Sequence, residues 1–220
     1  WNLCRIVALA DATADVAALV AAASRDCELP ALDYSLARLE DADWVALSRA
    51  QFQPIEISPR LWIVPSWHEP PVPDAHIIRL DPGAAFGTGS HPTTRLCLQW
   101  LEAHGESLRG AQVIDYGCGS GILAIAALKL GAATALGVDI DTQAVDAARR
   151  NAAENQVVAT FRTVTAAVAE DADIVLANIL ANPLKILAPA LAGHTRPGGH
   201  LVLAGLLDEQ AEELMQIYQP

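Results

Sequence analysis

A chain of 220 residues has room for one large domain, or for one domain of ordinary size with a small companion. Hydrophobic residues make up 52% of it and charged residues 18%, which predicts a soluble protein with a packed core and excludes a disordered chain. The net charge of -12 repels phosphate backbones, so we expect no direct binding of nucleic acid. No apolar run approaches the ~18 residues that span a bilayer, and we expect no membrane contact.

The cysteines and the first residues bear on the cellular compartment. Four cysteines are scattered without a C-x-x-C pair or a nearby histidine cluster, so we expect neither a metal site nor a disulfide framework. This pattern is typical of a reducing cytoplasm, where we place the protein. The chain begins at Trp1 without the charged start, apolar run and cleavage site of a signal peptide, which indicates the boundary of a fragment.

The sequence before residue 80 predicts a small α/β unit. An apolar run at 3–9, an Ala-rich stretch at 12–23 and an alternating segment at 34–39 predict a strand, a helix and a second strand. Asp41 or Asp43 could cap a helix that follows.

A proline-rich segment separates this unit from the rest of the chain. A predicted strand at 61–64 is followed by four prolines between 65 and 73, which sustain neither a helix nor a central strand. We therefore divide the chain into a partial N-terminal domain with a linker helix (1–53), a linker (54–75) and a larger domain (76–220).

The larger domain alternates between apolar strands and helices. Such strands, separated by helices, predict a parallel sheet covered on both faces, a Rossmann-like α/β fold. The predicted strands are 112–115, 133–139, 157–163, 173–178 and 200–204. The predicted helices are 92–103, 121–130, 142–155, 183–192 and 208–218.

A strand, a glycine turn and a helix start meet in this domain. Gly117, Gly119 and Gly121 let the backbone turn sharply and let a ligand approach without a Cβ in the way. Dinucleotide folds bind pyrophosphate with G-x-G-x-x-G, whereas the spacing here is G-x-G-x-G with Asp115 before it. This variant suits S-adenosylmethionine, because backbone N–H groups can take its carboxylate and Asp115 can lie near its ammonium, directly or through water. A tight turn without a ligand is the alternative.

A second acid ends the next predicted strand. Asp139 follows the glycine turn at close to the ~20 residues expected of a carboxylate that binds both ribose hydroxyls. We prefer it to Asp141, which is placed to cap the next helix. Ile140 would lie against the adenine ring. The alternatives are a solvated strand-end acid for Asp139 and an ordinary core residue for Ile140.

The loop at 81–94 is the third element. It combines glycines with Phe86 and Thr88, which predicts a loop that folds over the ligand. His91 precedes Pro92, a residue preorganised for the first turn of a helix. A role for His91 as a general base is conceivable, but a capping or packing role fits better. A plain connecting loop is the alternative.

Asn178 ends the fourth predicted strand, at the carboxyl edge where open α/β sheets bind ligands. Its amide oxygen and a nearby backbone carbonyl can accept hydrogen bonds from an amine and aim the lone pair at a methyl donor. An amide cannot remove a proton, so its catalytic role would be positioning. A simple strand-end turn residue is the alternative.

With these four elements in this order, the sequence resembles the PrmA family of protein methyltransferases, which methylate ribosomal protein L11. The run from Phe86 to Thr94 is the most specific part of the likeness, whereas the glycine turn is shared by many methyltransferases. The resemblance covers roughly residue 34 to the end, and loosely the stretch before. The matching segments are 60–67, 80–94, 113–130, 137–141 and 178–184.

The resemblance implies a two-domain enzyme. A small N-terminal domain would dock the ribosomal protein, and a seven-stranded domain would transfer methyl groups from S-adenosylmethionine. It also implies that Thr94, Gly117, Asp139 and Asn178 contact the cofactor. The acceptors would be amines, both lysine side chains and an N-terminal α-amine. We expect a monomer.

The chain departs from the family pattern in three places. It begins partway through the recognition domain and stops at Pro220, before a last pair of strands. Ser48 stands where a second tryptophan is usual after Trp44. We therefore expect this fragment to bind the cofactor while docking its protein substrate poorly, with one sheet edge left open.

Three other functions share part of this pattern. A small-molecule or nucleic-acid methyltransferase would share the cofactor loop, but the acidic charge and the loop before Thr94 disfavour it; a methyltransferase of another protein stays an alternative. A non-catalytic module that keeps the fold would bind the cofactor without transferring a methyl group. A nicotinamide dehydrogenase is the weakest alternative because the glycine spacing is wrong.

Overall fold

The computed structural model describes residues 6–38, 52–81, 89–164 and 170–219. Several predicted features lie outside these residues: those of Asp41, Asp43, Trp44, Ser48, Phe86 and Thr88. The chain divides into two compact units, Trp1–Leu47 and Ser48–Pro220, and each is described by itself.

The described part of the first unit contains the helix α1 (Val16–Asp26). Asp15 caps it, since its carboxylate accepts a hydrogen bond from Ala18 N at 3.0 Å. The strands predicted at 3–9 and 34–39 are wrong as far as these segments are described, because no strand is formed at 6–9 or 34–38. A strand needs a neighbour that satisfies its backbone groups, and an apolar pattern alone does not supply one.

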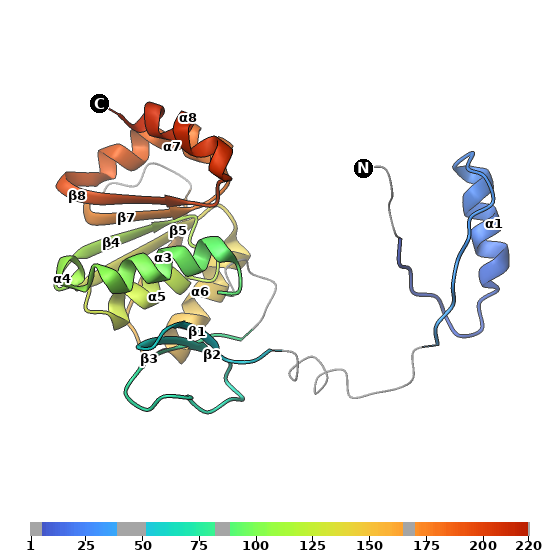
Figure 1. The fold of residues 1–220 in the computed structure, drawn as a ribbon, viewed down its shortest axis with the longest axis horizontal. Helices are drawn as coiled ribbons and strands as arrows, with labels where there is room; N and C mark the ends of the chain where they lie inside the picture. The colour runs from blue at the N-terminus through green and yellow to red at the C-terminus, as the bar shows by residue number, and fades with distance from the viewer. Residues whose placement is uncertain (1–5, 39–51, 82–88, 165–169, 220) are drawn as a thin grey trace. The chain divides into compact units, whose positions relative to one another are not determined.

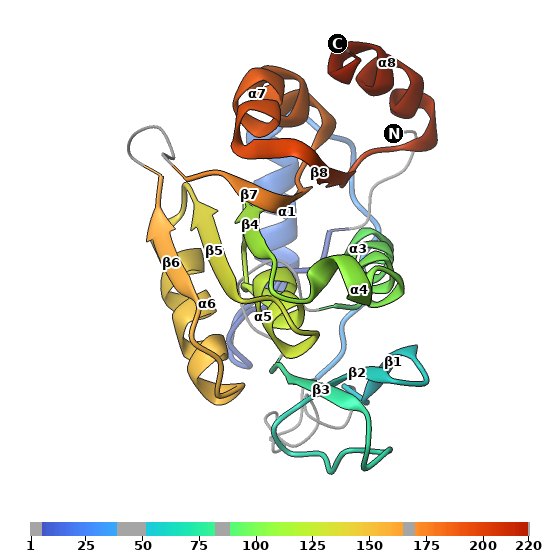
Figure 2. The same cartoon turned by 90° about the vertical axis from the view of Figure 1, so that its left-hand side faces the viewer.

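The second unit is built around a parallel five-stranded sheet with the order β6-β5-β4-β7-β8 (Figures 1 and 2). All neighbouring strands are parallel, so their carboxyl ends meet at one edge. This arrangement confirms the predicted Rossmann-like α/β fold. The strands are β4 (Gln112–Tyr116), β5 (Thr134–Asp139), β6 (Thr160–Thr163), β7 (Ala172–Asn178) and β8 (Thr195–Ala204).

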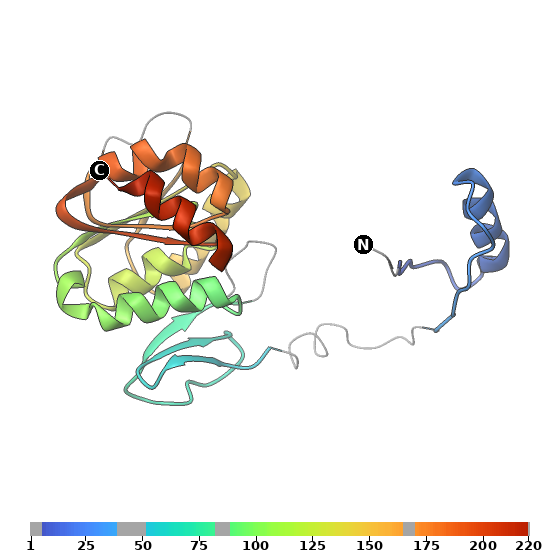
Figure 3. The same cartoon turned by 45° about the horizontal axis from the view of Figure 1, so that its top comes forward.

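Helices cover both faces of this sheet (Figure 3). One face carries α3 (Pro92–Ala103), α5 (Ile122–Lys129) and α6 (Thr142–Glu154), and the short α4 (Gly105–Leu108) follows α3. The other face carries α7 (Ala181–His194) and α8 (Asp208–Tyr218). Among the described residues, no helix is both long enough and apolar enough to cross a bilayer.

A second, smaller sheet contains β1 (Ile55–Ser58), β2 (Leu61–Val64) and β3 (His76–Arg79). β1 and β2 are antiparallel, and β2 and β3 are parallel. Two of these strands lie in the segment for which a linker is predicted. The prolines on which that prediction depends lie between β2 and β3, outside both strands. The domain boundaries themselves stay a prediction.

Two asparagines, one within α6 and one at its C-terminus, connect this helix to the small sheet and to the glycine turn. Asn155 pairs with the backbone of Arg79 as a neighbouring strand would: its Oδ1 accepts from Arg79 N and its Nδ2 donates to Arg79 O, both at 2.7 Å. One turn earlier, Asn151 Nδ2 donates to Ser120 O in the glycine turn at 2.8 Å. The same helix therefore fixes both the small sheet and the glycine turn.

Candidate functional site

The glycine turn lies at the carboxyl end of β4, directly before α5. Gly117, Gly119 and Gly121 have φ values of +76°, +52° and +77°, in the left-handed region that favours glycine. Gly117 N and Cys118 N both donate to Val138 O, at 2.8 and 3.0 Å, which fixes the turn against β5. Gly121 offers no side-chain cap to α5, so the start of this helix can take an anionic group.

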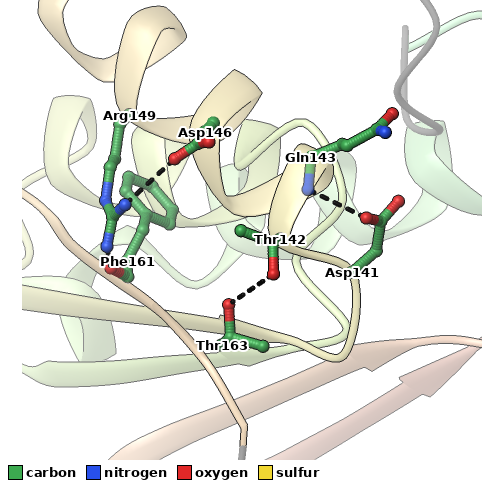
Figure 4. Close-up of polar contacts among 7 residues, drawn as sticks. All are labelled: Asp141, Thr142, Gln143, Asp146, Arg149, Phe161 and Thr163. Carbon is green, nitrogen blue, oxygen red and sulfur yellow. Dashed lines mark hydrogen bonds and ion pairs between the residues drawn. The ribbon is translucent and has the colours of Figure 1, made fainter.

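The ring of Phe161, on β6, packs against this turn and against β5. A Cβ at Gly121 would come within 2.9 Å of Phe161 Cζ, and one at Gly137 within 2.4 Å of Phe161 Cδ1. Arg149 of α6 fixes the position of β6, since its Nη2 donates to Phe161 O at 2.7 Å and its Nη1 pairs with Asp146 at 3.0 Å (Figure 4). The glycines therefore also make room for the side chain that supports the turn.

Asp139 lies at the carboxyl end of β5, beside the glycine turn. Its Oδ2 accepts from Gly119 N at 2.9 Å and its Oδ1 from Asp141 N at 3.0 Å. Each oxygen keeps a further lone pair for a ligand hydroxyl. Asp141 caps α6 as predicted, since its Oδ1 accepts from Gln143 N at 2.8 Å (Figure 4). Ile140 is 87% exposed, which excludes the core role that was its alternative.

Asn178 ends β7 and contacts the first turn of α3. Its Nδ2 donates to Thr94 Oγ1 at 3.2 Å, and Thr94 is buried. The Oδ1 atom of Asn178 is also buried, and it accepts no hydrogen bond within the described part of the chain. A buried acceptor without a partner is costly, so its presence at a strand end points to a donor on a ligand. An amine N–H is such a donor.

Asp115 is the most deeply buried acid of the site, at 1% exposed. Its Oδ2 accepts from Ala124 N, in the first turn of α5, at 3.2 Å. Burial raises the pKa of this carboxyl to about 7, against the opposing hydrogen bond from Ala124 N and with a smaller contribution from the charge of Asp139. At neutral pH this carboxyl is therefore close to its midpoint of titration.

Known proteins are similar to this chain along its whole length. The family model "Ribosomal protein L11 methyltransferase (PrmA)" matches residues 1–220. The ribosomal protein L11 methyltransferase of Chromobacterium violaceum is 58% identical over 219 residues, which cover 99% of this chain and 72% of that protein. The protein of the same name from Neisseria meningitidis is 55% identical over 218 residues, with 99% and 73% covered. The chain belongs to the ribosomal protein L11 methyltransferase family.

A solved structure agrees with this membership. The ribosomal protein L11 methylase from Lactobacillus delbrueckii subsp. bulgaricus is 37% identical, with a TM-score of 0.65, over 76% of this chain and 85% of that one. Membership of the L11 methyltransferase family confirms the predicted type of enzyme, a methyltransferase on a Rossmann-like sheet that uses S-adenosylmethionine.

The structure places most of the predicted site residues at one edge of the five-stranded sheet, where the carboxyl ends of the strands meet. Their contacts with the cofactor stay a prediction, and Phe86 and Thr88 lie outside the described residues. His91 caps α3 through a hydrogen bond from Thr93 N at 3.3 Å, which confirms its expected role. No group of three or more metal-binding side chains occurs within the described ranges. The residues at the edge are Thr94, Asp115, Gly117, Gly119, Gly121, Asp139, Ile140 and Asn178.

Two residues at this edge were not expected from the sequence. Ile179 follows Asn178, and its Cγ2 lies 2.4 Å from the place where a Cβ of Gly117 would be. Gly205 follows β8 and lies against the backbone of Ile179. The only signal in the sequence was a glycine directly after a predicted strand end, which many folds contain for other reasons.

The raised pKa of Asp115 should make the binding of S-adenosylhomocysteine depend on pH. If its carboxylate lies near the ligand's ammonium, binding favours the ionised form. The Kd of S-adenosylhomocysteine should then fall by about tenfold between about pH 6 and pH 8, as a carboxyl with a pKa of about 7 ionises. Asp115→Asn should remove this dependence. Calorimetric titration at several pH values measures it, and an equal slope in the variant would contradict the assignment.

The folding equilibrium provides an independent check of the same pKa. A folded-state pKa raised from 3.8 to about 7 gives a stabilising contribution that is complete below about pH 4 and is lost as the pH rises through 7. The unliganded protein should therefore become less stable from pH 5 to pH 8, and Asp115→Asn should reduce this decline. Denaturant unfolding of both proteins tests it.

Proposed function

We propose that this protein transfers methyl groups from S-adenosylmethionine to amines of ribosomal protein L11, both lysine side chains and the N-terminal α-amine. The names of its relatives support the substrate. The observation that carries the amine chemistry is the buried Oδ1 of Asn178, which accepts no hydrogen bond from the residues that the structure describes. An amine supplies the missing N–H and presents its lone pair in a fixed direction.

The residues of the carboxyl edge fit this cofactor. The turn around Gly117, Gly119 and Gly121 leaves room for its methionine end, and the start of α5 offers N–H groups to the carboxylate. Asp139 has free lone pairs for the ribose hydroxyls, and the exposed Ile140 is available to the adenine ring. When bound, the cofactor would supply a methyl group on a positively charged sulfur; a nucleophile takes the methyl group, and S-adenosylhomocysteine is the leaving group.

The acceptor amine must be neutral when it attacks. A lysine has a pKa of about 10.4 and an α-amine one of about 7.7–8.0, so the lysine in particular must first lose a proton. An apolar site disfavours the ammonium and helps this loss. Asn178 Oδ1 and the backbone carbonyl of Ile179 can each accept one amine N–H, which leaves the lone pair to point at the methyl group. We propose that water takes the proton that the ammonium loses. The amide of Asn178 can accept a hydrogen bond from the amine but is too weak a base to remove its proton.

We propose that the protein acts as a monomer in the cytoplasm and binds no nucleic acid directly, as a net charge of -12 favours. We also propose that residues 76–220 form the catalytic domain and that residues 1–53 contribute to recognition of the ribosomal protein. The described cysteines Cys27, Cys97 and Cys118 are free thiols, as a reducing compartment would keep them.

The test combines binding with turnover. We expect calorimetric titration to give micromolar Kd values for S-adenosylmethionine and S-adenosylhomocysteine and no heat with NAD. Incubation with ribosomal protein L11 and S-adenosylmethionine should then add methyl groups to its amines, measured by mass spectrometry of its peptides. Binding without any transfer, even at L11 concentrations high enough to offset the weak docking expected of this chain, would support the non-catalytic module instead. Methylation of carboxyl or hydroxyl groups would contradict the amine assignment.

A further inference from the structure

The backbone that follows Asn178 is enclosed by two glycines from different parts of the sheet. On one side, Ile179 Cγ2 lies 2.4 Å from the position of a Cβ at Gly117. On the other side, the O, C and N atoms of Ile179 lie 2.3, 2.8 and 3.0 Å from the position of a Cβ at Gly205. The side chain of Ile179 therefore contacts the cofactor turn, and its peptide group contacts the turn after β8.

The register of the sheet explains this contact. Asn178, the last residue of β7, pairs with Ala204, the last residue of β8, so Ile179 and Gly205 leave the sheet side by side. Gly205 has a φ of +87°, in the left-handed region. Any side chain at this position would collide with the Ile179 backbone rather than with the flexible end of another side chain.

We propose that Gly205 and Ile179 are positioning residues for methyl transfer. Together they set the distance between the cofactor turn at Gly117 and the two amine acceptors, Asn178 Oδ1 and the Ile179 carbonyl. This inference rests on the proposed function. Thr94 already fixes the amide of Asn178 from the side of α3, so Gly205 and Ile179 complete its support from the side of β8.

The size of the effect follows from the needs of methyl displacement. The amine lone pair and the methyl group must be aligned, and a displacement of about 1 Å can cost about a hundredfold in rate. A collision at 2.3 Å with the Ile179 carbonyl requires a shift of this order in one of the two turns. The collision lies at the Ile179 backbone and not at the three glycines of the cofactor turn, so we expect the affinity for the cofactor to change little.

A pair of glycine variants separates this contact from backbone strain. Gly205→Ala introduces both a strained φ and the collision. Gly198→Ala introduces only the strain, because Gly198 has a φ of +79° and a Cβ there would meet nothing within 4 Å. We expect kcat for L11 methylation to fall at least about tenfold in Gly205→Ala. The KM for L11 and the Kd of S-adenosylhomocysteine should stay close to the wild-type values, as should kcat of Gly198→Ala.

A second pair tests the side-chain contact and does not depend on how Gly205→Ala folds. Ile179→Val keeps both γ carbons and therefore the contact with Gly117, whereas Ile179→Ala loses it. We expect kcat to fall about tenfold in the alanine variant and to be largely retained in the valine variant. S-adenosylhomocysteine affinity should be similar in both.

The outcomes separate this inference from the proposed function. An active wild-type protein with equal kcat in folded Gly205→Ala and Gly198→Ala overturns the inference alone, as does a loss of S-adenosylhomocysteine affinity in proportion to kcat. If Gly205→Ala does not fold, equal kcat in the two Ile179 variants overturns it. A wild-type protein that binds the cofactor but methylates no amine contradicts the proposed function and the inference with it.

Discussion

Asn178→Ala should lower kcat for L11 methylation by about 10²–10³-fold while the Kd of S-adenosylhomocysteine changes by less than about threefold. The amide is held by Thr94 on its nitrogen side, and its buried oxygen has no partner on the described part of the protein. We propose that the acceptor amine supplies this donor. Its removal costs alignment of the nucleophile rather than binding of the methyl donor.

The measurement needs kcat at saturating S-adenosylmethionine and a separate calorimetric Kd. Asn182→Ala is the matched control, since Asn182 belongs to the same segment but is exposed at the start of α7. It should retain kcat. Equal turnover of Asn178→Ala and wild type would remove Asn178 from the catalytic role and with it the main argument for an amine acceptor.

Most of the larger domain could be predicted because its signals are local. The predicted bounds of α3 and α8 coincide with the observed ones, and α3 begins where His91 caps a helix that starts with Pro92. β8 begins five residues earlier than predicted. Its register is irregular opposite Asp173, so the segment around Pro197 and Gly198 is accommodated as a bulge.

The predictions failed where pairing over long distances decides the structure. The apolar run near Ile6 and the alternating segment near Leu36 fit strands by pattern, yet the described residues 6–9 and 34–38 form none, and both side chains are exposed. Residues 55–58 lie in the predicted linker, but they form β1 and pair with β2. The hydrophobic periodicity of a segment indicates whether it can form a strand. Whether the strand forms depends on a neighbouring strand with which it can pair.

The same distinction applies to the site. Asp139 and Asn178 could be found because both end apolar strands, and parallel topology brings such ends together. The contact between Thr94 and Asn178 joins residues 84 apart in the chain, and only the family resemblance suggested Thr94 beforehand. The contacts of Ile179 with two glycines depend on how its side chain and its peptide group pack among the ends of three strands, which no spacing in the sequence encodes.

Asp139→Ala should raise the Kd of S-adenosylhomocysteine about a hundredfold or more. Two hydrogen bonds from ribose hydroxyls to a charged carboxylate contribute about 3 kcal/mol or more together, which corresponds to at least about a hundredfold in affinity. In the structure both carboxylate oxygens are already oriented, by Gly119 N and Asp141 N. The ligand therefore meets a preorganised acceptor, and its loss should appear in the binding constant measured by calorimetry.

Asp141→Ala is the control for this prediction, because Asp141 lies two residues away and carries the same charge. Its carboxylate caps α6 through Gln143 N (Figure 4), so its removal should lower the free energy of unfolding by about 1 kcal/mol and leave the Kd nearly unchanged. The two variants thus separate ligand binding from helix stability. The reverse result, with affinity lost only in Asp141→Ala, would transfer the ribose contact to Asp141 and leave Asp139 as a support of the glycine turn.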